Sequence, residues 1–182
     1  MSLAIGLMEY KTVPKGVEAA DAMLKASDVR LLFSSPICPG KYVSIISGEV
    51  DAVRTAVGKA ALVGGIFTVD SHVLPNVHPS VIPALTGTAE FEGVEALGLV
   101  ETISAVAAIT AGDVAAKAAS IDLLEIRIAR GLGGKGFVVF TGDLGSVEAS
   151  VGACEKRLGE EGGVVSSSVI ASPHRDLVAV LL

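Results

Sequence analysis

The segment Ala4-Ile5-Gly6-Leu7-Met8-Glu9 decides the fold, because it returns 92 residues later as Ala96-Leu97-Gly98-Leu99-Val100-Glu101. Further matched pairs follow in the order of the chain: Ala19 with Ala111, Asp21 with Asp113, Lys25 with Lys117, Gly48 with Gly142, and His78 with His174. Two short insertions are enough to keep this correspondence across nearly the whole sequence, which chance would not achieve. The sequence therefore predicts a tandem repeat of two small domains, at residues 1–88 and 94–182.

Each copy shows the same order of apolar patterns. In the first copy we predict strands at 3–9, 29–34, 41–47 and 66–73, helices at 17–24 and 50–62, and a short helix after Pro79. The second copy gives strands at 95–101, 121–129, 135–141 and 164–170, helices at 105–119 and 144–157, and a short helix after Pro173. The order β-α-β-β-α-β is the split βαβ arrangement, so we predict an α/β (α+β) fold of two ferredoxin-like domains.

The composition excludes several classes of protein. Hydrophobic residues make up 51% of the 182 residues, but no run of about 18 or more apolar residues occurs, so no membrane span is expected. A net charge of −6 argues against nucleic acid as the main partner, because phosphate binding needs clustered Lys and Arg. Two cysteines and an N-terminus without a basic segment favour the reducing cytosol. With charged residues at only 19%, much of the surface is expected to meet other protein.

Several motifs lack the structural context that their chemistry needs. Residues 131–136 spell GxGxxG, but they lie between two predicted strands and not at the start of a helix, so no nucleotide-phosphate site is predicted. Asp70-Ser71-His72 contains the residue types of a catalytic triad, which is defined in space and not by adjacency, and it is interpreted as the end of an edge strand. His78 and His174 hold equivalent positions in the repeat, which favours a structural role. No acid–base or nucleophile constellation emerges, so an enzyme is the least favoured class.

The two cysteines lie in different contexts. Cys154 falls in the middle of a predicted helix and is expected to be a small buried apolar residue. Cys38 lies between two strands in Ser34-Ser35-Pro36-Ile37-Cys38-Pro39-Gly40, where proline stiffens the backbone. A free thiol in a turn is one interpretation. The other is a metal ligand, which requires a symmetry axis, because iron–sulfur clusters need about three or four thiolates and one chain offers a single cysteine here.

Both copies resemble bacterial microcompartment shell proteins, and the likeness covers almost the whole chain. It is carried by residues 4–9, the helix at 19–26, the helix start Gly48-Glu49-Val50, and the ending Val73…Pro75…His78-Pro79. The resemblance implies two BMC domains with the unpermuted strand order and a homotrimer that mimics a hexamer. The Cys-Pro-Gly loop is similar to that of tandem-domain members from propanediol-utilisation compartments. Those members hold a central [4Fe–4S] cluster through one cysteine per chain.

In this family the connection between the second and third strands surrounds a central pore. The resemblance places these residues there: Ser35, Pro36, Ile37, Cys38, Pro39 and Gly40 in the first copy, and Arg130, Gly131, Leu132, Gly133 and Gly134 in the second. Three chains would bring three Cys38 thiolates to the axis, where they would hold three irons of a shared [4Fe–4S] cluster. Arg130 stands where the first copy has Cys38, and three such positive charges would favour a cluster with net negative charge.

The matched lysines Lys25 and Lys117 lie in Ala-rich helices, where a lysine is most often simply solvated. Their equivalent positions raise the alternative of a shared contact, and the resemblance implies that they mediate side-by-side tiling of trimers into sheets. The implied partners are further copies of this chain, other shell proteins and, as a candidate, an encapsulated redox enzyme. Neither nucleic acid nor a membrane is among them.

The resemblance implies a structural shell protein of a cytoplasmic microcompartment and not an enzyme. The cluster would serve electron transfer across the shell or cluster supply to enzymes inside, and both remain open. One alternative keeps the shell tile but makes the central loop a metabolite pore without a cluster. An alternative from another class is a ferredoxin-like small-molecule-binding regulatory protein, which would need convergent polar residues that the sequence does not show.

Overall fold

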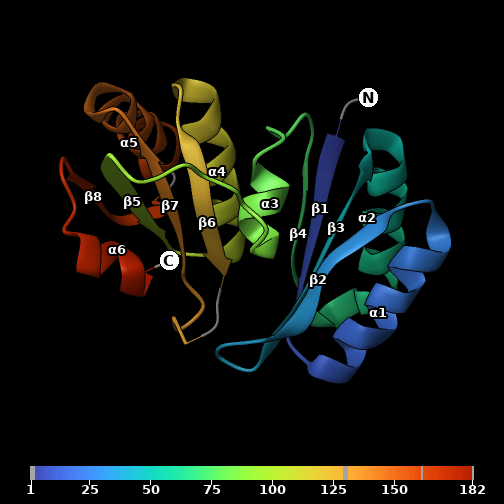
Figure 1. Ribbon diagram of the computed structural model, residues 1–182. Helices are drawn as coiled ribbons and strands as arrows, with labels where there is room; N and C mark the ends of the chain where they lie inside the picture. The colour runs from blue at the N-terminus through green and yellow to red at the C-terminus, as the bar shows by residue number, and fades with distance from the viewer. Residues whose placement is uncertain (1–2, 129–130, 161, 182) are drawn as a thin grey trace. The chain divides into compact units, whose positions relative to one another are not determined.

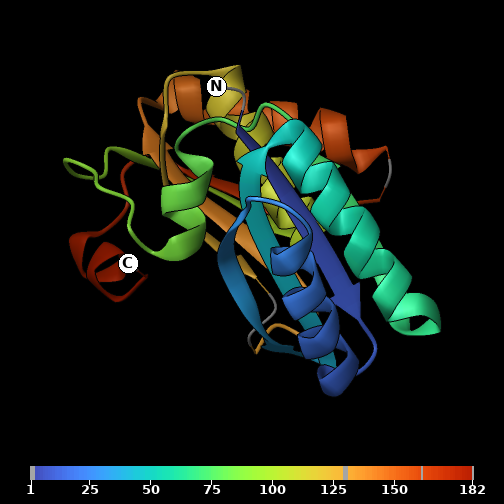
Figure 2. The same ribbon diagram turned by 90° about the vertical axis from the view of Figure 1, so that its right-hand side faces the viewer.

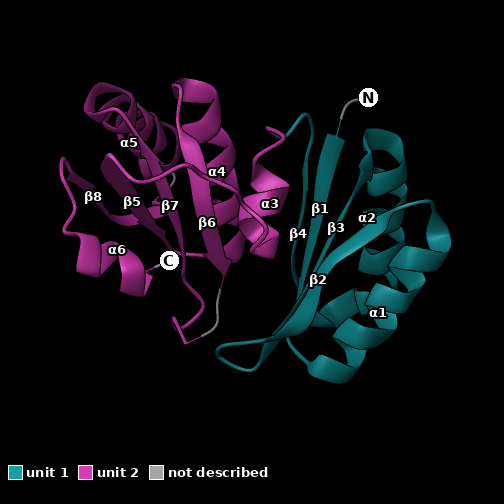
Figure 3. Cartoon of the chain, viewed as in Figure 1, with its two compact units in different colours: residues 1–77 teal, residues 78–182 magenta. Residues whose placement is uncertain are grey.

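The computed structural model describes residues 3–128, 131–160 and 162–181 of the chain. By internal packing it divides into two compact units, Met1–Val77 and His78–Leu182 (Figure 3). Within the described residues each unit contains a four-stranded antiparallel sheet with helices packed against it. The predicted α+β fold with two copies of β-α-β-β-α-β is confirmed.

Unit 1 begins with the central strand of its sheet. Its elements are β1 (Leu3–Tyr10), α1 (Val13–Ala26), β2 (Arg30–Ile37), β3 (Lys41–Glu49), α2 (Val50–Gly64), a 3₁₀ turn (Gly65–Phe67) and β4 (Thr68–Leu74). The strands run in the order β2-β3-β1-β4, so β1 pairs with β3 on one side and with β4 on the other (Figure 1). Helices α1 and α2 lie side by side against the sheet (Figure 2).

Unit 2 repeats this plan with two additional short helices, one before its first strand and one after its last. It contains α3 (Val81–Thr86), β5 (Ala96–Thr102), α4 (Ala105–Ala118), β6 (Asp122–Ile128), β7 (Gly136–Gly142), α5 (Leu144–Gly159), β8 (Val164–Ile170) and α6 (Arg175–Leu181). The strand order β6-β7-β5-β8 matches that of unit 1 strand for strand. The two sheets therefore show in three dimensions the repeat that the sequence predicts.

The glycine of the repeated segment explains why that segment decides the fold. Gly6 lies in the central strand β1, where an added Cβ would come within 2.7 Å of Val57 and 2.8 Å of Val53 on α2. In unit 2 a Cβ on Gly98 would overlap the ring of Phe140. Both positions need glycine because a neighbour already fills the space above the central strand. Ile5 and Leu7 beside Gly6 are buried, and so are Leu97 and Val100 near Gly98.

The short helix α3 follows the first copy in the sequence but packs within unit 2, against β6 and α4. The predicted domains, 1–88 and 94–182, follow the sequence repeat, whereas the compact units follow packing and divide after Val77. The repeat boundaries therefore stay a prediction. Among the described residues no helix is both long enough and apolar enough to cross a membrane.

Candidate functional site

Cys38 lies at the tip of the hairpin formed by β2 and β3. Ile37 and Lys41 are the last paired residues, so the turn consists of Cys38, Pro39 and Gly40 (Figure 1). Gly40 has φ of 78°, a conformation that glycine adopts without strain. Cys38 is exposed and its thiol is free of any disulfide. The hairpin therefore presents one thiol to the outside of the chain.

The structure corrects the predicted extent of this loop. Ser35, Pro36 and Ile37, which we placed in the connection, belong to β2 and pair with Val43, Tyr42 and Lys41 of β3. Proline is compatible with this position because β2 lies at the edge of the described sheet, where one side of the backbone needs no partner. The strand thus continues three residues further than predicted, and the turn is correspondingly tight. The assignment of these residues to a pore stays a prediction.

The matching connection in unit 2 lies between β6 and β7. Gly131, Leu132, Gly133 and Gly134 all lie in it, as predicted, and the backbone N–H of Lys135 donates to the carbonyl of Leu132 at 3.2 Å. The three glycines have positive φ, between 63° and 94°, which explains the glycine-rich sequence without any phosphate site. Arg130 lies outside the described residues.

An ion pair that the apolar pattern of the sequence does not indicate lies beside each hairpin connection. Lys41 Nζ lies 2.5 Å from Glu9 Oε1 in unit 1, and Lys135 Nζ lies 2.5 Å from Glu101 Oε1 in unit 2. The hydrogen bond from Lys135 holds the pKa of Glu101 below its usual range. The matched positions of the two glutamates in the repeat, together with a lysine at the start of each third strand, could have revealed the pair. Each ion pair links the lysine at the end of a connection to a glutamate of the central strand.

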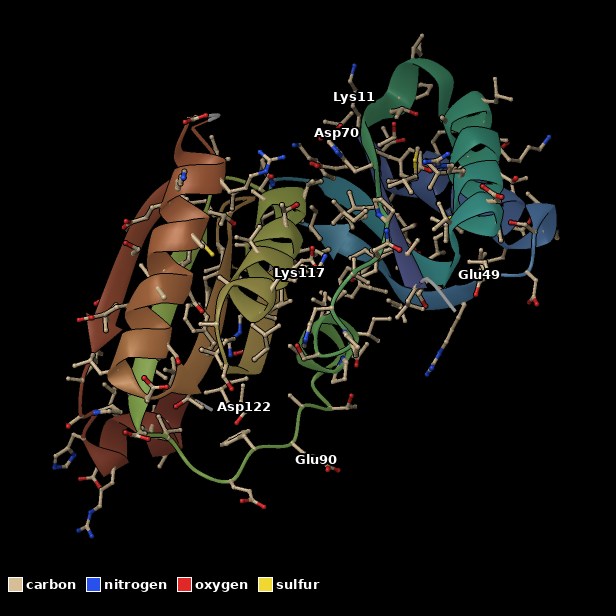
Figure 4. All side chains as sticks on the ribbon, turned by 90° about the horizontal axis from the view of Figure 1, so that it is seen from above. Lys11, Glu49, Asp70, Glu90, Lys117 and Asp122 are labelled. Carbon is tan, nitrogen blue, oxygen red and sulfur yellow. The ribbon has the colours of Figure 1, made fainter. Side chains whose placement is uncertain are left out.

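The two matched lysines occupy the same place in their helices. Lys25 Nζ contacts Asp21 Oδ2 at 2.6 Å near the end of α1, and Lys117 Nζ contacts Asp113 Oδ2 at 2.6 Å near the end of α4. Figure 4 labels Lys117 on its helix. The lysine and aspartate are four residues apart, so both lie on one helix face. Both lysine side chains remain substantially exposed. Neither is locked into the core, and tiling by these lysines stays a prediction.

The second cysteine and the three histidines lie in surroundings that fit a structural role. Cys154 is fully buried, as predicted, and its Sγ lies 3.3 Å from the carbonyl oxygen of Ala111. The carbonyl of His78 accepts from the N–H of Val81, and that of His174 accepts from the N–H of Leu177, so both histidines lie just before short helices. His72 lies on the edge strand β4 beside Asp70, with 2.9 Å between Nε2 and Oδ1.

One chain brings no complete metal site together in the part that the structure describes. Among those residues no group of three or more His, Cys, Asp or Glu side chains lies close enough to hold an ion. Cys38 is the exposed thiol of the chain, and Cys154 is buried.

The fold and the repeated sequence define the family. The chain belongs to the BMC domain family, whose model matches residues 4–77 and again residues 96–173. The bacterial microcompartment shell protein PduT of Citrobacter freundii is 43% identical over 177 residues, which cover 97% of this chain and 96% of that protein. A microcompartment protein from Desulfitobacterium hafniense, of known crystal structure, is 45% identical to this chain. The match covers 97% of this chain and 98% of that protein, and the two superpose with a TM-score of 0.95.

A single-domain relative fits the same pattern. The major carboxysome shell protein CsoS1 of Prochlorococcus marinus is 35% identical over 96 residues. These residues are 92% of that protein but 51% of this chain. The match therefore spans about half of this chain and nearly all of that protein, as expected when one copy of the repeat is aligned.

Proposed function

We propose that this protein is a structural shell tile of a bacterial microcompartment and not an enzyme. The observation that carries the proposal is the pair of BMC domains in one chain, with nearly complete coverage of a relative named as a microcompartment shell protein. Six domains from three chains would form a disc with approximate sixfold symmetry. Discs of this kind would tile beside other shell proteins, with Lys25 and Lys117 at their edges.

Two measurements test the proposal directly: the number of chains in the assembly, and incorporation of the protein into shells. Native mass spectrometry of the full chain should give three times the 18.4 kDa of one chain. Expression beside a set of microcompartment shell proteins should place a labelled copy in the purified shells. A monomer in solution that stays out of the shells would contradict the role of a tile.

We further propose that three Cys38 thiolates, one from each chain, hold a shared [4Fe–4S] cluster at the centre of the trimer. Support comes from the exposed thiol at the tip of a tight turn and from the lack of a complete ligand set within the described part of one chain. Three thiolates would bind three irons and leave the fourth without a protein thiolate. When bound, such a cluster supplies a one-electron redox couple. Transfer of electrons across the shell wall is the function that we favour, with cluster supply as the other outcome.

A comparison of two cysteine variants tests the proposed cluster. Protein purified without oxygen should contain iron and show visible absorption and an EPR signal after reduction. Cys38→Ser should lose all three signals, whereas Cys154→Ala should keep them, because the thiol of Cys154 is fully buried. Iron-free wild-type protein would reject the cluster. If that protein were still trimeric, the alternative of a metabolite pore at the same loop would stand.

A further inference from the structure

The hairpin that carries Cys38 is held on both faces of its sheet. Ile37 pairs with Lys41 next to the turn, and Pro36 pairs with Tyr42 one step further back. Because successive residues of a strand point to opposite faces of a sheet, Lys41 and Tyr42 extend from the start of β3 to its two sides. Each of these side chains meets its own anchor within unit 1.

On one face the anchor is the ion pair of Lys41 with Glu9. Lys41 is the first residue after the turn, and its Nζ lies 2.5 Å from Oε1 of Glu9 on the central strand β1. The side chain of Glu9 is only 9% exposed. The pair resists separation, because separation would leave a buried carboxylate without a compensating charge. Ile37, the residue before Cys38, is 6% exposed, so the chain is held at both ends of the turn.

On the other face the anchor is the side chain of Tyr42. Tyr42 is buried, and a Cβ on Gly16 of α1 would come within 2.5 Å of its ring, so this glycine leaves the room that the ring fills. The hydroxyl of Tyr42 lies 2.9 Å from Ser34 Oγ, which in turn lies 3.1 Å from Ser44 Oγ. This chain of hydroxyls crosses from β3 to β2 and back, and it joins the two arms of the hairpin.

The matching connection of unit 2 contains no cysteine, and its described residues are held less tightly. It spans residues 129–135, whereas the turn of unit 1 has three residues. Gly136 stands where unit 1 has Tyr42, so the ring and its hydroxyl are missing. Lys135 still pairs with Glu101, but the side chain of Glu101 is 31% exposed. The firmly held hairpin is therefore the one that carries the thiol.

We propose that Glu9, Lys41 and Tyr42 are positioning residues, which fix the place of the Cys38 thiol before it binds a cluster. The inference rests on the proposed cluster and explains why one hairpin of the chain is held so firmly. Three thiolates that share one cluster must lie at fixed places, and a ligand that is already ordered loses less conformational freedom on binding. Glu9 and Lys41 carry opposite charges, so the pair sets the place of the thiol without adding net charge around it.

Amide hydrogen exchange of iron-free protein tests the positioning without the cluster. Glu9→Gln combined with Lys41→Met removes the ion pair, keeps the net charge and leaves no buried charge unpaired, so the fold should be kept. We expect exchange at residues 37–42 to become roughly tenfold faster. The matched control, Glu101→Gln with Lys135→Met, should leave these residues unchanged, and Lys41→Arg, which keeps the ion pair, should exchange as the wild type does. Equal exchange in the wild type and both double variants would overturn the positioning role.

Iron loading then separates positioning from a merely structural role. Compared at equal amounts of folded trimer, Glu9→Gln with Lys41→Met should hold less cluster than the wild type, and its reduced protein should give a broader EPR signal per bound cluster. Lys41→Arg should restore both.

A second variant changes a single hydroxyl. Tyr42→Phe should show the same two changes in weaker form, whereas Tyr10→Phe, which removes a buried hydroxyl elsewhere in unit 1, should not. Wild-type cluster content and EPR signal in both the double variant and Tyr42→Phe would overturn the positioning role and leave the cluster standing. Iron-free wild-type protein would instead reject the cluster, and the exchange measurement would still decide whether these residues fix the turn.

Discussion

At the scale of single residues, the two thiols of the chain differ in their access to solvent. Cys38 is exposed, whereas burial, reinforced by the charge of Glu155, raises the pKa of Cys154 to about 12. In native, iron-free protein we therefore expect iodoacetamide to modify one thiol per chain, at Cys38, and both thiols only after unfolding. Mass spectrometry of peptides would locate the label. Equal labelling of both thiols in the native protein would contradict the buried environment of Cys154.

The raised pKa of Cys154 also has a consequence for stability. Burial raises the pKa of this thiol from its ordinary value of 9.0 to about 12, so the folded state holds the proton more tightly. The contribution of this group to the free energy of unfolding is fully present at pH values below the unfolded pKa. It is lost as the pH rises through the folded pKa. Denaturant titrations of wild type and Cys154→Ala between these values should converge as pH rises. A constant difference would contradict the assigned shift.

Two tyrosines of unit 1 make a matched comparison of buried hydroxyls. Tyr10 is fully buried, burial raises its pKa, and its hydroxyl has no hydrogen-bond partner among the described residues. The hydroxyl of Tyr42 lies 2.9 Å from Ser34 Oγ. We expect Tyr10→Phe to leave the free energy of unfolding unchanged or to raise it by about 1 kcal/mol, and Tyr42→Phe to lower it by about 1 kcal/mol. Denaturant unfolding measures both, and a clear loss in Tyr10→Phe would show that its hydroxyl is paired.

At the scale of elements, the starts of α2 and α5 differ although they hold the same place in the repeat. Asp143 accepts from the backbone N–H of Ser146 at 3.0 Å, and hydrogen bonds from Ser146 hold its pKa below the usual range. Glu49, its counterpart, makes no such cap. Asp143→Ala should lower the melting temperature of the chain at neutral pH, and Glu49→Ala should change it far less.

The pH dependence of this cap follows from the direction of the shift. A carboxyl with a lowered pKa contributes stability above its unfolded value of 3.8, and the contribution disappears as pH falls through the folded pKa. The melting temperatures of wild type and Asp143→Ala should therefore approach one another in acid. A difference that persists in strong acid would mean that the cap does not depend on the charge of Asp143.

The elements also show what the sequence could and could not reveal. Helices and central strands were predictable because their apolar spacing matches in both copies, and each copy supports the other. The end of β2 was placed too early because Pro36 suggested a break, whereas an edge strand tolerates proline. The ion pairs of Glu9 with Lys41 and Glu101 with Lys135 join segments far apart in the sequence, so the repeat hints at them but the sheet register is needed to pair them.

At the scale of the whole molecule, we expect Lys25 and Lys117 to matter for the tiling of discs into sheets but not for the assembly of chains into a disc. Lys25 and Lys117 form exposed ion pairs within their own helices, and such pairs contribute only about 0–1 kcal/mol to stability. Lys25→Ala and Lys117→Ala should therefore keep the fold and the proposed trimer. If these lysines mediate tiling, electron microscopy should show that the ordered sheets of the wild type are lost. Sheets that form as readily in the double variant would contradict the tiling role.

At this scale the structure also shows where exposed apolar side chains lie. A hydrophobic share of 51% suggested surfaces that meet other protein, and the structure finds exposed apolar side chains on α1 and α6. The sequence alone could not locate these surfaces, because the same repeat positions are buried in one copy and exposed in the other. Comparison of Val81 with Leu177 reveals the difference only once burial is known.

The central claim is that three chains assemble around one cluster bound through Cys38. Native mass spectrometry of protein purified without oxygen tests both parts in a single spectrum. The account predicts a species of three chains with the added mass of one [4Fe–4S] cluster, and for Cys38→Ser three chains without that mass. Wild-type protein that appears as single chains, or as three chains with no added mass, would contradict it.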